Sequence, residues 1–273
     1  MFSVTTRREN FSKWPICRLI MIDENIPYFV IASVAMYSSL HFLDTISMCS
    51  NIAGKLTNNI SQGAIYQKSI SVGARLFLPP VLIILSLLIE HNISTSLFFL
   101  IAAIHTFSAF LTTIISIYKI NFYQQIFQRS FFYRQNLTLP VSLFKAVFVS
   151  KSKCPKSIEF KNKISFSKTR RKKLYVSIVS YFFLGTGFLL SFAIATVYSE
   201  FRMTISQLTS VFHGIGAIIL SFYIDPFLSK SIDTVKRNEK WIDNLSSIFF
   251  GRLIAYLLAT FLFLLLAFNY PNL

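Results

Sequence analysis

The stretch ISTSLFFLIAAIHTFSAFLTTIISIY, residues 93–118, decides the fold because it contains no Asp, Glu, Lys or Arg. A membrane-spanning helix needs about 20 mainly apolar residues, so this stretch predicts one. The whole chain points the same way: its 273 residues are 53% hydrophobic and 14% charged, with 30 Phe and a mean hydropathy of +0.56. A soluble domain of this length cannot hide so much apolar surface, so the sequence predicts an integral membrane protein.

Five further apolar runs have a similar length. The runs are continuous rather than alternating, which excludes a porin-like barrel and predicts an all-α, polytopic protein with about six transmembrane helices. We therefore expect residues 26–273 to form one membrane domain in the inner (cytoplasmic) membrane. The five runs are residues 26–47, 64–89, 174–198, 203–224 and 249–270.

A basic central loop, residues 119–173, fixes the predicted topology. It is rich in Lys and Arg and contains a single acid, Glu159, so the positive-inside rule places it in the cytoplasm. Such loops account for the formal net charge of +16, and we expect no nucleic-acid partner because the cations lie between membrane spans. Its apolar part, residues 139–149, is either a short helix lying on anionic lipid or an ordinary solvated loop.

The N-terminal tail, residues 1–25, breaks this rule. Six spans place it outside, yet it carries Arg7, Arg8, Lys13 and Arg18. A start at Met21, just before the first span, would remove all four cations. We therefore expect that residues 1–20 do not belong to the native protein, which mass spectrometry of the native N-terminus tests.

Polar residues gather around the end of the first span. Tyr37, His41 and Asp44 share one helix face, where they either pair near the cytoplasmic surface or line a hydrated cavity. Residues 51–59 form a predicted polar turn, in which Gly54 permits a left-handed or close-approach conformation. Lys55 in this turn is either a point charge for a phosphate or part of a plain hairpin.

Arg75 is the deepest charge, about 16 Å into the second span. Pro79 and Pro80 follow it and are expected to kink or break the helix. A cation beside a broken helix is typical of transporter substrate sites. The alternative is a structural salt bridge to Asp44 or Glu90.

The last two spans carry weaker signals. The small and polar residues of 206–216 predict close helix packing, with a proton relay through His213 as the alternative. Asp225 is expected to begin a turn. Arg252 is expected to snorkel from the cytoplasmic end of the last helix to the surface.

Motifs for catalysis are absent from the sequence, which predicts that the protein is not an enzyme and needs no cofactor. The cysteines are Cys17, Cys49 and Cys154. Their spacing gives neither a disulfide framework nor a zinc pattern, so no metal site is predicted.

The polar motifs resemble the Amj family, the alternate lipid II flippases of bacterial peptidoglycan synthesis. The first motif runs from His41-Phe-Leu-Asp44-Thr45 through Asn51-Ile-Ala-Gly54 to Arg75 and Pro79, and the second joins Gly214, Asp225-Pro226, Ser229 and Asp233. The resemblance covers most of residues 26–240, and Met21 falls where the family's chains usually begin. One departure is Asn51, where the family usually has an arginine, which leaves Lys55 as the cation of this turn.

The resemblance implies translocation of lipid II, an undecaprenyl-pyrophosphate carrying a disaccharide-pentapeptide. A flippase needs a hydrated groove open to lipid and cations for the pyrophosphate. The substrate-binding residues expected are Arg75, Asp44, His41, Lys55 and Lys68. Two other functions remain open at this point: ion-coupled transport of a small anion, and a membrane scaffold whose basic loop recruits partners.

Overall fold

The computed structural model describes residues 9–91, 93–148, 170–234 and 238–269, and all regular structure in these ranges is helical. The all-α prediction is therefore confirmed. In chain order the elements are α1 (Glu9–Leu56), α2 (Ile60–Ala74), η1 (Arg75–Phe77), α3 (Leu78–Glu90), α4 (Thr95–Tyr118), α5 (Ile120–Tyr133), α6 (Leu139–Phe148), α7 (Arg171–Val197), η4 (Ser199–Phe201), α8 (Arg202–Ser206), α9 (Leu208–Ile219), η5 (Leu220–Ile224), α10 (Asp225–Thr234) and α11 (Asn238–Asn269).

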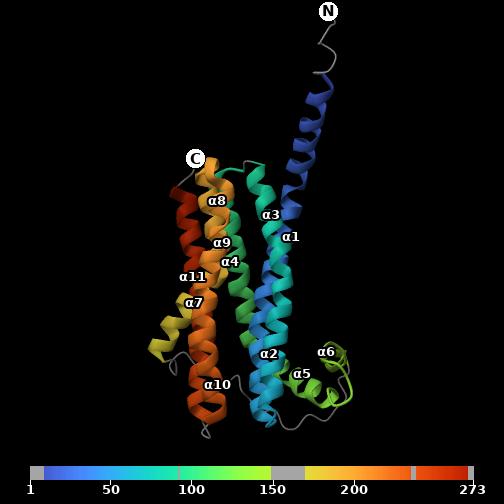
Figure 1. Cartoon of the computed structure of the whole chain (residues 1–273), viewed down its shortest axis with the longest axis vertical. Helices are drawn as coiled ribbons and strands as arrows, with labels where there is room; N and C mark the ends of the chain where they lie inside the picture. Colours follow the sequence, from blue (N-terminus) through green and yellow to red (C-terminus); the bar gives the residue numbers. More distant parts are fainter. Residues whose placement is uncertain (1–8, 92, 149–169, 235–237, 270–273) are drawn as a thin grey trace, which may run out of the picture.

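Six stretches of the described chain are long and apolar enough to cross a membrane, as predicted. They run up and down in turn, and the α1–α2 turn, α5, α6 and α10 lie at the same lower end (Figure 1). On α4 the outward stripe of apolar side chains is exposed, as expected for a surface facing lipid. The six stretches are Ile26–Leu56, Ile60–Glu90, Thr95–Tyr118, Arg171–Val197, Arg202–Leu228 and Trp241–Asn269.

Several helices are longer than predicted. α1 continues to Leu56, so the predicted turn of residues 51–59 is confined to the few residues before α2. The predicted loop of residues 225–248 is also wrong, because α10 and α11 occupy all of it except residues 235–237, which lie outside the described residues. The polar side chains of α1 bond within the protein, as Ser50 Oγ does to Gly63 O at 2.8 Å, so the helix need not end where polarity begins.

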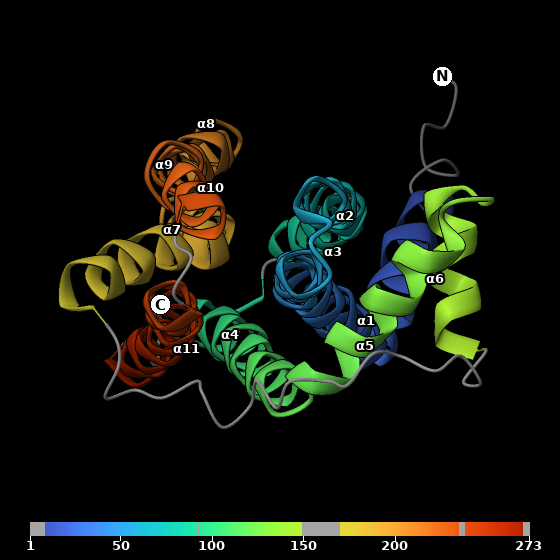
Figure 2. The same cartoon turned by 90° about the horizontal axis from the view of Figure 1, so that it is seen from below.

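The central loop is partly helical. α5 was not predicted at all, whereas α6 confirms the helical interpretation of residues 139–149. Tyr66 of α2 ties both to the bundle, since its hydroxyl lies 2.9 Å from Ser130 Oγ and 2.7 Å from Ser142 Oγ. Seen from below, α5 and α6 lie beside α1, outside the other spans (Figure 2). Residues 149–169 of this loop, residues 1–8 of the N-terminal tail and the end of the predicted last span at residue 270 lie outside the described residues.

A close contact of two glycines joins α1 to α2. A Cβ on Gly63 would lie 2.7 Å from Ser50 O and 3.2 Å from Gly54 Cα. The close-approach conformation predicted for Gly54 is thus confirmed. The left-handed conformation is wrong, because the described residue with positive φ here is Asn58, at 55°.

This contact predicts that Gly63→Ala destabilises the protein. The added methyl group meets backbone that has no room to move, and such overpacking costs about 1–3 kcal/mol. Gly73→Ala, on the same helix, is the control because a Cβ there meets nothing within 4 Å. Thermal unfolding in detergent should show a lowered Tm for Gly63→Ala alone; equal values for both variants would contradict the contact.

The second span breaks where the prolines predict. α2 ends at Ala74, the turn Arg75–Phe77 is 3₁₀-helical, and α3 restarts with Pro79 and Pro80 in its first turn. Prolines fit there because the first N–H groups of a helix have no partner within it. Arg75 therefore lies at a helix break inside the second span.

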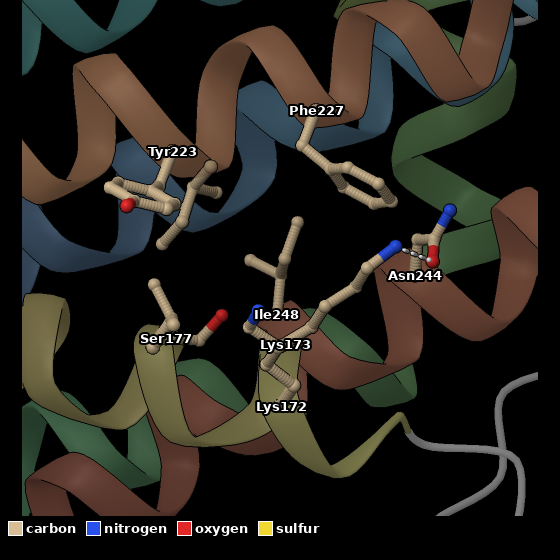
Figure 3. A pocket seen from close by; sticks show the side chains of 9 residues that line it. Lys172, Lys173, Ser177, Tyr223, Phe227, Asn244 and Ile248 are labelled. Carbon is tan, nitrogen blue, oxygen red and sulfur yellow. Dashed lines mark hydrogen bonds between the residues drawn. The ribbon is translucent and has the colours of Figure 1, made fainter.

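Two apolar clusters fill the bundle, one above the other. The upper one includes Tyr37 and Tyr256, and the lower one includes Met48 and Phe249. At the lower end α7 is fixed to α11, where Lys173 Nζ donates to Asn244 Oδ1 at 2.7 Å (Figure 3). Between the two clusters lies a layer of polar side chains.

A charged layer and a polar cavity between the helices

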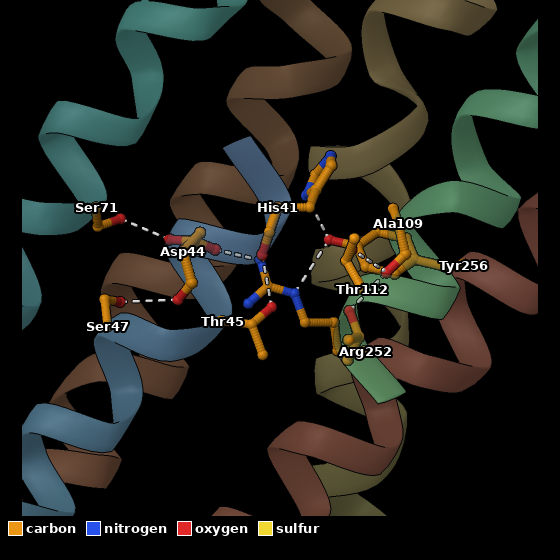
Figure 4. A network of polar contacts seen from close by, with 10 residues as sticks. His41, Asp44, Thr45, Ser47, Ser71, Ala109, Thr112, Arg252 and Tyr256 are labelled. Atoms are coloured by element: carbon orange, nitrogen blue, oxygen red, sulfur yellow. Dashed lines mark hydrogen bonds and ion pairs between the residues drawn. The ribbon is translucent and has the colours of Figure 1, made fainter. Parts of the chain in front are cut away.

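The polar layer is centred on an ion pair between Asp44 of α1 and Arg252 of α11. Arg252 is 1% exposed and Asp44 is 23% exposed at the side chain. Ser71 of α2 donates to the other carboxylate oxygen of Asp44 at 2.6 Å. The ion pair and this bond join three spans in the middle of the bundle (Figure 4).

Aromatic side chains complete the layer. Arg252 Nε donates to Tyr256 Oη at 3.0 Å, and Tyr256 Oη lies 2.6 Å from His41 Nδ1. Tyr181 of α7 lies beneath the guanidinium, with its ring centre 4.5 Å from the Arg252 Cζ atom. Tyr37 packs edge-on against His41, with ring centres 4.3 Å apart, so the face predicted from Tyr37, His41 and Asp44 is confirmed.

Three predictions about these charges are wrong. Arg252 does not snorkel, because it lies about 16 Å into its span and is fully enclosed. Asp44 and His41 do not lie near the cytoplasmic surface, since α1 continues to Leu56, about 18 Å beyond Asp44. Asp44 does not pair with Arg75, because Arg252 from another span reaches it instead.

A cavity of about 440 Å³ opens beside the ion pair. Ile60, Lys68 and Val72 of α2 line one side, and Ser221 and Asp225 line the other. These walls belong to different helix pairs, since α2 packs on α1 whereas α9 packs on α7 (Figure 2). Ile60 and Val72 are 36% and 57% exposed, so the cavity is open at its side.

Two cations project into this cavity from α2. Lys68 and Arg75 both line it, two helical turns or about 10 Å apart along the axis. Both are exposed, and within the described residues neither forms an ion pair. Asp225 lies on the facing wall, so it begins a helix that lines the cavity rather than the predicted turn.

A smaller space of about 50 Å³ joins the cavity to the ion pair. Asp44 and Arg75 line both spaces, and His41, His213 and Arg252 line the smaller one. His41 Nε2 and Arg252 Nη1 are buried and have no hydrogen-bond partner among the described residues. Buried polar atoms of this kind ordinarily contact water, and the space is large enough for it.

The five predicted binding residues are thus placed differently. Asp44, Lys68 and Arg75 line the larger cavity, and His41 lines the smaller space. Lys55 lines neither, because its ammonium group lies 5.8 Å from the centre of the Trp241 ring. His213 faces the smaller space, and close packing of its helix is also present, since a Cβ on Gly216 would lie 2.7 Å from Ser180 O.

The sequence analysis missed Tyr181, Tyr256 and the pairing of Arg252. Arg252 and Tyr256 are four residues apart on an otherwise apolar span, which places them on one helix face. That spacing was the available signal for an inward-facing polar pair.

The fold and this site define an all-helical, multi-span membrane protein with a cationic cavity open between its helices. The chain belongs to the Amj family, described as "Alternate to MurJ", whose model matches residues 36–269. Members are lipid II flippases that replace MurJ, so the protein is a flippase of the cytoplasmic membrane and not an enzyme. Searches of curated proteins and of solved structures gave no match.

Proposed function

We propose that the cavity between α2 and α10 receives the pyrophosphate of lipid II, and that Arg75 and Lys68 bind it. The observation that carries this proposal is the position of the two cations in a polar cavity, without ion-pair partners in the described chain. Arg offers a planar fork that matches phosphate oxygens, and Lys offers a mobile point charge. Together they suit a pyrophosphate, which carries its charge on two neighbouring groups.

The open side of the cavity suits a lipid-linked substrate. The sugar-peptide head cannot cross hydrocarbon, whereas the polyprenyl tail can stay in it. A cavity bordered by exposed apolar side chains, such as Ile60 and Val72, lets the tail remain in the bilayer while the head enters. A carrier of a small anion would instead enclose its site.

The ion pair has a separate role in this proposal. Asp44 neutralises Arg252, so the deepest cation does not hold the pyrophosphate midway across. The pair also fixes α1 to α11, while the α9–α10 wall is held mainly by α7. The two walls of the cavity can then move apart without breaking the polar layer.

Filling the cavity tests the proposed route. Ala64 lines the cavity and is exposed, and its neighbour Ile65 is 48% exposed but lines no described cavity. Ala64→Trp should abolish rescue of cells depleted of their other lipid II flippases, because the indole occupies the space of the head group. Ile65→Trp should rescue normally. Full rescue by Ala64→Trp, at equal membrane levels, would sink the proposed route.

A further inference from the structure

A second cavity, of about 250 Å³, lies on the other side of α10. Val176 of α7, Ile224 and Phe227 beside it, and Ile248 of α11 give it a mainly apolar lining. Figure 3 shows Tyr223 and Phe227 on one side and the α7 residues Lys173 and Ser177 on the other. This volume lies below the range of about 300–1,000 Å³ usual for sites that enclose a whole small ligand. It suits part of a hydrocarbon chain.

The mouth of this cavity is strongly cationic. Lys172 and Lys173 line it, and Arg170 and Arg171 precede them at the start of α7. The first turn of α7 has no acidic residue, and no side chain caps it. The N–H groups and dipole of a helix N-terminus also favour an anion, so five sources of positive potential meet here.

A buried hydroxyl points to a ligand in the same cavity. Ser177 is 1% exposed and lines the cavity, and its Oγ has no hydrogen-bond partner among the described residues. A buried hydroxyl without a partner is costly, and a polar ligand group beside it removes that cost. The cations and this hydroxyl thus independently indicate a polar, anionic group at the edge of an apolar cavity.

We infer that this cavity binds an anionic phospholipid of the cytoplasmic leaflet. The phosphate lies at Lys172 and Lys173, the glycerol region lies near Ser177, and one acyl chain enters between Phe227 and Ile248. Basic pockets between membrane helices bind anionic head groups in this way. The cavity is too small for a disaccharide-pentapeptide, so this site differs from the one proposed for lipid II.

The position of this lipid links it to the cavity proposed for the substrate. Ile224 and Phe227 face the lipid site, whereas Ser221 and Asp225 of the same segment face the larger cavity. The segment combines the π-helical turn Leu220–Ile224 with α10, and π-turns are frequent at functional sites. A lipid bound behind this wall braces it against α7 and α11.

Native mass spectrometry of the full-length protein tests the site. The protein is reconstituted in nanodiscs with equal phosphatidylglycerol and phosphatidylcholine, extracted, and scored for retained lipid. We expect retained phosphatidylglycerol, and about tenfold less of it for Lys172→Ala with Lys173→Ala. Lys119→Ala with Lys145→Ala is the matched control, because those cations lie on Tyr118 and Tyr133, away from the cavity.

A second variant keeps the test decisive if the lysine variant does not fold. Val176→Trp leaves every charge in place and fills the apolar cavity, so it should also lose the retained phosphatidylglycerol. Equal retention by the wild type and by both cavity variants would overturn the site. Retention of phosphatidylcholine, or of a polyprenyl-linked lipid, in place of phosphatidylglycerol would overturn it as well.

Discussion

Asp44→Ala is expected to lower the free energy of unfolding by about 3–5 kcal/mol, and with it the amount of folded flippase in the membrane. The variant leaves the guanidinium of Arg252, which is 1% exposed, without its counter-ion. Removing one partner of a buried pair costs more than the pair itself contributes, because the remaining charge stays buried and uncompensated. Thermal unfolding of the purified protein in detergent measures the change.

Two controls separate the charge from the lost contacts. Asp44→Ala combined with Arg252→Leu removes both charges and should recover most of the stability. Ser71→Ala removes one hydrogen bond to the carboxylate and should cost only about 1–2 kcal/mol. A single Asp44→Ala variant as stable as the wild type would show that the ion pair does not hold the bundle together.

Arg75→Ala is expected to abolish rescue of flippase-depleted cells while leaving the Tm within about 1 °C of the wild type. Arg75 is exposed in the cavity and has no ion pair in the described chain, so its removal leaves no buried charge behind. A charged hydrogen bond contributes about 1.5–3 kcal/mol, so losing those to the pyrophosphate should slow flipping about ten- to a hundredfold. Growth rescue and membrane protein level are measured together.

The matched variants for Arg75 define what is lost. Arg75→Lys keeps the charge without the planar fork and should rescue in part. Lys119→Ala removes a cation outside the cavity and should rescue fully. Normal growth with Arg75→Ala would remove Arg75 from the substrate site, whereas a large fall in Tm would assign it a structural role.

What depends on local composition could be predicted from the sequence. The six spans follow from apolar runs of sufficient length, and the break near Arg75 follows from Pro79 and Pro80, whose rings cannot continue a helix. The polar face of Tyr37, His41 and Asp44 follows from helical spacing. These features need no knowledge of which spans are neighbours.

What depends on contacts between distant residues could not. Asp44 and Arg252 lie 208 positions apart, and a single sequence does not show that α1 and α11 are adjacent. The same limit explains the misplaced helix ends, because Ser50 and Asn51 look like turn residues until their bonds to α2 are seen. Lys55, predicted to bind phosphate, instead lies over Trp241 of α11.

The most direct test of the central claim is lipid II flipping by the purified protein in liposomes, scored by the fraction of lipid II that an impermeant reagent can reach. The wild type should make lipid II in both leaflets accessible, and Lys68→Ala with Arg75→Ala should leave the inner leaflet protected at equal protein content. Equal flipping by this double variant and the wild type would contradict the claim that these two cations carry the pyrophosphate across.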